Sequence, residues 1–186
     1  NQRYQTSEGY ISRFTQNIPL ISKSYSLTNS YDYKIYNEWL DENIFSIGFF
    51  GKTTNSLSGK DVKLSDRLYL PASKLRGFES GKVGPKDGND YIGGNYAASI
   101  NIATTLPQIL PNLQNTNFSI FFDVANIWGI DYDSALNDES KIRSSVGISV
   151  DLLTPVGPLN FSLSEPITKG NNDITESFRF DIGTTF

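Results

Sequence analysis

Apolar and polar residues alternate along most of this chain with a period of two, which is the period of a β-strand and not of a helix. In the last segment, residues 178–186, the apolar face is interrupted only by Thr184 and carries Phe178, Phe180, Ile182 and Phe186. Seven further segments repeat the pattern, within residues 10–18, 25–35, 45–49, 96–106, 120–128, 146–152 and 159–167. The sequence therefore predicts an all-β fold of about eight strands.

The face opposite the apolar one is rich in Ser, Asn, Thr and Gly, which is too hydrophilic for the inside of a β-sandwich. It suits the wet interior of a membrane barrel, where only every second residue needs to be apolar. The composition agrees, because only 38% of the residues are hydrophobic while 13% are aromatic. No run approaches the roughly 18 apolar residues of a membrane helix, so a chain like this spans a membrane only with strands. We predict a transmembrane antiparallel β-barrel.

Short and long connections alternate between the predicted strands. The short turns are residues 40–43, 107–116 and 154–157, and the longer polar connections are 55–93, 129–140 and 168–175. Outer-membrane barrels place short turns on the periplasmic side and long loops outside, so both ends of this chain are expected at the periplasmic face. The connection 19–23 is short and departs from this contrast. A loop as long as 55–93 is expected to have a function of its own.

The composition also excludes several kinds of site. The chain has no His and no Cys, which removes histidine-based triads, thiol nucleophiles, disulfides and ordinary zinc sites. A net charge of −4 argues against a nucleic-acid partner, because phosphate binding requires a basic face. We therefore expect no enzyme activity, no cofactor and no bound metal. The chain starts at Asn1 rather than at an initiator Met, so we expect that further segments precede it.

Four blocks of residues, taken in order, resemble one known family. The loop 55–93 contains Leu75-Arg76-Gly77-Phe78-Glu79, and then Gly84-Pro85 and Gly93-Gly94-Asn95. The other three blocks are the strand segment 121–128 (Phe-Phe-Asp-Val-Ala-Asn-Ile-Trp), the segment 145–161 with its Pro-Val-Gly-Pro-Leu, and the final segment 178–186. Their order and spacing are similar to those of the BamA family of outer-membrane protein assembly factors, also called the bacterial surface antigen family. The four blocks cover roughly the final two-thirds of the chain.

The resemblance implies that residues 1–186 are the C-terminal part of an outer-membrane barrel, with about eight of its sixteen strands. It implies no POTRA domain within this chain, and a location in the bacterial outer membrane. The implied function is the assembly and insertion of other β-barrel proteins, without enzyme chemistry. The implied partners are outer-membrane lipid, unfolded outer-membrane proteins as substrates, and accessory assembly lipoproteins.

The resemblance also implies a site on the long loop. In the family this loop folds back into the barrel, and its Arg pairs with an acidic residue of the wall. Arg76 matches that Arg and Asp123 matches the wall residue, which the alternation independently places on the inward, polar face. A buried guanidinium needs a carboxylate partner, so the pairing is physically reasonable. A solvated Arg76 in an ordinary turn and an Asp123 that faces lumenal water remain the alternatives.

The neighbours of Arg76 receive roles from the same resemblance. Gly77 would permit a close approach to the wall, and Phe78 would pack against it. Many family members carry a second acidic residue on the neighbouring strand, where this chain has Ala103. Either the anchor is a single pair, or Glu79 assists it.

A lateral gate at the C-terminal strand is the remaining implication. Its unpaired edge would template incoming strands, and the residues concerned are Phe178, Phe180, Ile182, Gly183 and Phe186. Gly183 would weaken the pairing of this strand. Two alternatives remain for the function: a two-partner secretion pore that transports polypeptides, and a small stand-alone eight-stranded barrel. The second would have an interior only wide enough for side chains, with little space for so long a loop.

Overall fold

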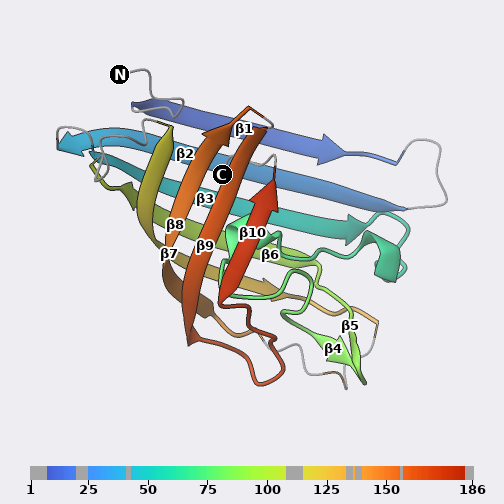
Figure 1. The fold of residues 1–186 in the computed structure, drawn as a ribbon. Helices are drawn as coiled ribbons and strands as arrows, with labels where there is room; N and C mark the ends of the chain where they lie inside the picture. The colour runs from blue at the N-terminus through green and yellow to red at the C-terminus, as the bar shows by residue number, and fades with distance from the viewer. Residues whose placement is uncertain are drawn as a thin grey trace.

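The fold is one antiparallel sheet whose strands follow each other in chain order (Figure 1). The structure, a computed structural model, describes residues 8–19, 25–40, 43–107, 115–132, 136, 140–155 and 157–182. The strands of the sheet are β1 (Gly9–Asn17), β2 (Ser26–Leu40), β3 (Asn43–Ser56), β6 (Tyr96–Thr105), β7 (Thr116–Trp128), β8 (Arg143–Thr154), β9 (Gly157–Thr168) and β10 (Phe178–Ile182). Between β3 and β6 lie two 3-10 turns, η1 (Leu64–Asp66) and η2 (Ala72–Lys74), and a hairpin of β4 (Lys86–Asp87) and β5 (Asp90–Tyr91). Among the described residues, no helix is long and apolar enough to cross a membrane.

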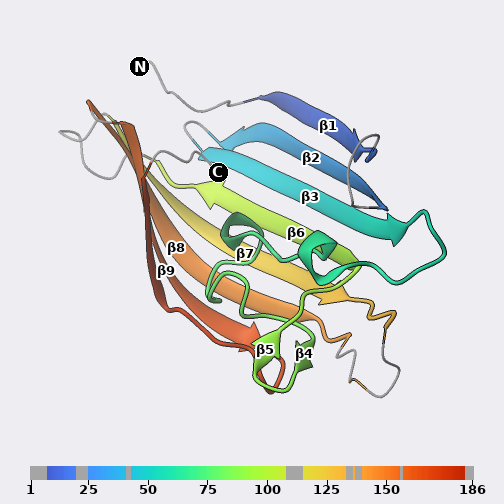
Figure 2. The same ribbon diagram turned by 90° about the vertical axis from the view of Figure 1, so that its right-hand side faces the viewer.

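The sheet is strongly curved and open. Its eight strands pair in the order β1-β2-β3-β6-β7-β8-β9-β10, and Figure 2 shows how they curve around the connection between β3 and β6. Within the described residues β1 and β10 do not pair with each other, so this sheet does not close. The prediction of an eight-stranded antiparallel sheet is confirmed. The alternative of a closed stand-alone eight-stranded barrel does not match this sheet.

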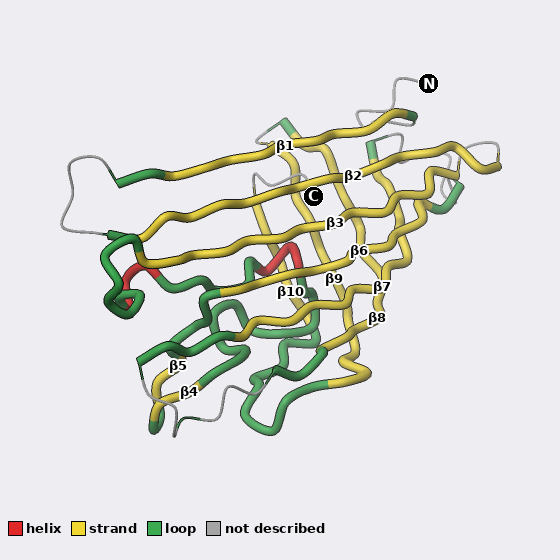
Figure 3. The backbone as a smooth tube through the Cα atoms, turned by 180° about the vertical axis from the view of Figure 1, so that it is seen from behind, coloured by secondary structure: helices red, strands yellow, loops and turns green. Residues whose placement is uncertain are grey.

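Antiparallel pairing gives the sheet two distinct ends. The start of β1, the end of β10 and the β2–β3, β6–β7 and β8–β9 connections share one end, which we call the turn rim. The connections 57–95, 129–142 and 169–177 share the other end, the loop rim, where Figure 3 shows most of the loop structure gathered. The predicted long connections end within two residues of these bounds. The predicted turns 40–43, 107–116 and 154–157 and the connection 19–23 lie partly outside the described residues.

The convex face of the sheet is apolar and exposed. Every strand contributes large side chains to it, among them Phe14, Ile35, Phe49, Ile100, Phe122, Ile148, Leu163 and Phe180. These are the faces that the period-two alternation predicts to be apolar. In water so wide an apolar surface would favour association, whereas in a bilayer it contacts the hydrocarbon.

The concave face is mostly polar, and the loop covers part of it. Small polar side chains are buried there, namely Ser99, Ser119, Ser145, Ser149, Asn160, Ser162 and Ser164. Closer to the loop rim the same face carries apolar residues, which pack against loop residues in a cluster of Phe50, Leu68, Leu70, Leu75, Phe78, Val83, Ala97, Ala125 and Ile127. The hydrophobic core therefore lies between the sheet and its own loop.

Candidate functional site

The loop (residues 57–95) is fixed to the sheet through Arg76, which lies against the middle of β7. The Nε and Nη2 atoms of Arg76 donate to the two carboxylate oxygens of Asp123 at 2.7 and 2.8 Å, and its backbone N–H donates to Oδ2 at 3.1 Å. Asp123 is fully buried, and Arg76 is only 9% exposed. A bidentate pair fixes orientation as well as distance. The structure thus brings into direct contact the two residues that the sequence analysis expected to pair.

Two further side chains hold this pair in place. The Arg76 guanidinium lies over the Phe121 ring, with 3.4 Å between the Arg76 Cζ atom and the ring centroid, so a cation–π contact adds to the ion pair. Asn101 lies opposite Asp123 on β6 and donates its amide to Asp123 Oδ1 at 2.9 Å and to the carbonyl of Lys74 at 3.0 Å. Neither residue received this role from the sequence. Asn101 could have been found only from the β6–β7 register.

Ala103 stands where many family members have a second acidic residue, and Glu79 is the residue expected to assist if the anchor is more than a single pair. Among the residues that the structure describes, neither is a hydrogen-bond partner of the Asp123 carboxylate. Ala103 pairs with Phe121 rather than with Asp123 in the β6–β7 register. Glu79 is exposed, and its backbone N–H donates to the carbonyl of Ile174 at 2.9 Å. The second polar side chain at the Asp123 carboxylate is therefore the amide of Asn101.

Gly77 lets the loop approach the wall closely. Its φ of +87° is a conformation that residues with a Cβ disfavour. A Cβ added here would lie 3.2 Å from Ser145 Cβ and 3.3 Å from Ser164 Cβ. The Ser145 hydroxyl donates to the carbonyl of Arg76 on the same approach. Phe78, the next residue, is 1% exposed within the core cluster.

We expect Gly77→Ala to loosen the docked loop by about 1–3 kcal/mol, because backbone strain and crowding by the two serines act together. Gly81→Ala is the matched control: Gly81 has a φ of +74°, but the nearest atom to an added Cβ is 3.9 Å away in the Tyr69 ring. Amide hydrogen exchange of loop residues 70–80 measures the difference. Equal exchange in the two variants would mean that crowding at Gly77 has no effect.

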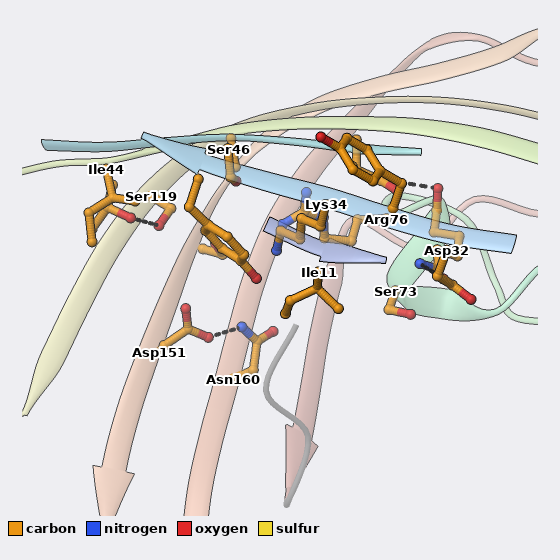
Figure 4. Close-up of a pocket in the computed structure, with 18 of the residues that line it drawn as sticks. Ile11, Asp32, Lys34, Ile44, Ser46, Ser73, Arg76, Ser119, Asp151 and Asn160 are labelled. Carbon is orange, nitrogen blue, oxygen red and sulfur yellow. Dashed lines mark hydrogen bonds and ion pairs between the residues drawn. The ribbon is translucent and has the colours of Figure 1, made fainter. Parts of the chain in front are cut away.

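A cavity of about 620 Å³ lies on the concave face beside the anchor (Figure 4). Charged side chains line it, and Lys74 Nζ, at the loop end of the cavity, pairs with Asp32 at 2.7 Å. On the far side Asn160 donates to Asp151 at 2.5 Å, and Lys34 lies between the two pairs in Figure 4. In the described part of the chain, no group of three or more acidic side chains could hold a metal ion.

A second buried ion pair lies at the loop rim. Arg143 at the start of β8 donates through Nε and Nη2 to Asp173 at 2.8 and 3.2 Å, and both side chains are completely buried. The Gly84 N–H of the loop donates to the same carboxylate at 3.2 Å. Arg143 also donates to Asn126 at 2.9 Å and to the carbonyl of Lys141 at 2.7 Å. The Arg143–Asp173 pair thus joins the connections 57–95, 129–142 and 169–177, and it was not found from the sequence.

The residues expected to form a gate lie at the edge of the sheet. Phe178, Phe180 and Ile182 are exposed on the convex face of β10, and the Phe180 ring stacks obliquely on Phe161 of β9 with 4.8 Å between centroids. β10 pairs with β9 over residues 178–182. The other two predicted gate residues, Gly183 and Phe186, lie outside the described residues.

Sequence comparison finds relatives along the chain. The family model described as the Omp85 superfamily domain matches residues 1–186. The outer membrane protein assembly factor BamA of Neisseria meningitidis is 27% identical over 167 residues, which cover 75% of this chain and 20% of that protein. BamA of Nitratidesulfovibrio vulgaris is 30% identical over 126 residues, 65% of this chain and 15% of that protein. The sorting assembly machinery 50 kDa subunit of Saccharomyces cerevisiae is 29% identical over 143 residues, 73% of this chain and 30% of that protein.

Structural comparison agrees with the sequence relatives. The crystal structure of BamA from Haemophilus ducreyi lacking POTRA domains 1–3 is similar to this chain with a TM-score of 0.82 at 25% identity. The match covers 97% of this chain and 39% of the crystallised one. The chain therefore spans only part of its relatives, between 15% and 20% of the two BamA sequences above.

Proposed function

Because the chain belongs to the Omp85 superfamily, we propose that it is part of an outer-membrane barrel that assembles and inserts other β-barrel proteins. The observation that carries this proposal is the fold similarity to a BamA barrel over 97% of the chain. The names of the sequence relatives, all assembly factors or assembly-machinery subunits, support the same function. The eight strands would form about half of a sixteen-stranded barrel wall.

The surroundings of the chain follow from its two faces. We propose that the exposed convex face contacts outer-membrane lipid, because its apolar side chains cover every strand. The bacterial BamA relatives support a bacterial outer membrane as the location. The substrates would be unfolded outer-membrane proteins, and accessory assembly lipoproteins would be further partners.

The loop would act as an internal brace directed into the lumen. The Arg76–Asp123 pair supports this role, because a buried bidentate ion pair fixes the loop on the wall at one point. Gly77 and Phe78 would let the loop lie close to β8 and β9. A braced wall would remain rigid while another part of the barrel moves.

The edge of β10 would be that moving part. Within the described residues β9 is the one strand that pairs with β10, and β10 has only five residues. The other edge of such a strand presents free N–H and C=O groups, which can template an incoming strand. The gate would therefore operate by adding strands at this edge, without covalent chemistry.

Reconstitution of the full-length protein tests the function. We expect lipid vesicles that contain it to fold a small, urea-unfolded outer-membrane barrel protein at least about tenfold faster than empty vesicles, because a preformed edge replaces unfavourable strand nucleation. The folded product is measured as the heat-modifiable band on a gel. A soluble secreted polypeptide loaded outside the vesicles serves as the comparison. Its transport into the vesicles without acceleration of barrel folding would favour the two-partner secretion pore.

A further inference from the structure

The loop also forms backbone hydrogen bonds with the residues that lead into β10. We call residues 173–177 the lead-in segment. Three bonds join it to loop residues 77–82: Glu79 N–H to Ile174 O at 2.9 Å, Ile174 N–H to Lys82 O at 3.0 Å, and Glu176 N–H to Gly77 O at 3.1 Å. A β-bridge pairs Phe78 with Thr175 in the same place. On the opposite side, Ser164 N–H of β9 donates to the carbonyl of Ser177 at 2.9 Å. The lead-in segment therefore lies between β9 and the loop.

Arg179, the second residue of β10, adds a side-chain link to the loop. Its Nη2 atom donates to the carbonyl of Phe78 at 3.1 Å and to the carboxylate of Glu176. The Arg179 side chain is 13% exposed and lies opposite Ser162 of β9. A charged donor in so buried a position makes a stronger hydrogen bond than a neutral one. Arg179 thus joins the loop, the lead-in segment and β10 itself.

Two contacts fix the beginning of the lead-in segment to the loop. Asp173 accepts the Gly84 N–H of the loop at 3.2 Å while it is paired with Arg143. The Tyr91 hydroxyl of β5 donates to the carbonyl of Asn172. Desolvation, with the charges of Asp173 and Glu79 nearby, raises the pKa of Tyr91. The contacts between loop and lead-in segment therefore extend from Asp173 to Glu176.

We propose that the loop and the lead-in segment move as one unit, and that Arg179 is the positioning residue that holds the start of β10 to this unit. Arg76 fixes the loop to the wall, so the loop-rim end of β10 is held as well. When an incoming strand reaches β10, only the turn-rim end of β10 could then move away from its neighbours. The contacts above indicate that the loop and the lead-in segment form one unit. The role of this unit in gating rests on the proposed function.

Hydrogen exchange of the full-length protein in lipid nanodiscs tests the role of Arg179. In Arg179→Gln we expect the amides of Ile174 and Glu176 to exchange about tenfold faster, because the lost charged hydrogen bond is worth at least one factor of ten. The Arg76 amide, which is bound to Asp123, should keep its protection. The matched control is Arg13→Gln, which removes the same charge from an exposed arginine of β1. Equal exchange in the two variants would overturn the role of Arg179.

A cross-link tests the unit without depending on that side chain. The chain has no Cys, so Glu79→Cys with Ile174→Cys creates a single pair, at exposed positions next to the Phe78–Thr175 bridge. We expect oxidation to close the disulfide and to leave assembly within about twofold of the reduced form. A tenfold or larger loss on oxidation, reversed by reductant, would show that loop and lead-in segment must separate. If the reduced protein and the wild type both fail to assemble substrates, the proposed function fails, while the hydrogen-exchange result still decides whether the unit exists.

Discussion

Asp123→Ala is expected to release the loop from the sheet and to abolish barrel assembly by the full-length protein. The substitution leaves the Arg76 guanidinium buried without its carboxylate, and it removes the acceptor of the Arg76 backbone N–H and of the Asn101 amide. Breaking one side of a buried ion pair costs about 3–5 kcal/mol. Because the strands keep their own hydrogen bonds, this cost falls on loop docking before it affects the sheet. Trypsin, which cleaves after Lys and Arg, should then cut the loop at Lys74 and Arg76.

Asp32→Ala is the matched control for that experiment. Asp32 also pairs with a loop cation, Lys74, but both side chains are partly exposed, at 33% and 26%. Exposed pairs contribute about 0–1 kcal/mol, so trypsin resistance and assembly should remain close to wild type. Similar cleavage rates in Asp32→Ala and Asp123→Ala would contradict the role of the buried pair as the loop anchor.

Asp173→Ala should have the second large effect, at the loop rim. It removes the buried carboxylate that pairs with Arg143, and it removes the acceptor of the Gly84 N–H. We expect a loss of about 3–5 kcal/mol, measured by urea unfolding in lipid vesicles. Asp90→Ala is the control, because Asp90 is an exposed aspartate in the β4–β5 hairpin of the loop (residues 57–95). Its free energy of unfolding should stay within about 0.5 kcal/mol of wild type.

A double variant distinguishes the cost of burying a charge from the cost of losing the hydrogen bonds. Arg143→Met with Asp173→Leu replaces the ion pair by apolar side chains, which often restores stability where a single substitution does not. We expect the double variant to be more stable than Asp173→Ala. If it is equally unstable, the hydrogen bonds to Gly84 and to the neighbouring backbone carry most of the stabilisation.

The faces of the strands could be predicted from the sequence because a period of two records directly which side of a strand a residue occupies. Phe49 and Phe180, for example, are both exposed on the predicted apolar face. The lengths of the loops could also be predicted, because turn residues interrupt the alternation. Asp123 was placed on the inner face by the same pattern, and its pairing with Arg76 was suggested only by the family resemblance.

The contacts between distant segments could not be predicted from one sequence. Asn101 meets Asp123 because of the β6–β7 register, and a shift of one residue would turn its side chain to the other face. Arg143 and Asp173 are 30 residues apart, and their meeting depends on how two loops fold over the rim. Arg179 and Phe78 are 101 residues apart. No local sequence pattern shows that residues so far apart in the chain are in contact.

The apolar cluster between the loop and the sheet has a consequence for permeability. A wall lined with serine and asparagine would by itself enclose a path for water and ions. Leu68, Leu75 and Phe78 instead fill the space beside the wall near the loop rim with hydrocarbon, which solvates ions poorly. A barrel that contains this chain is therefore expected to conduct little current in a planar bilayer.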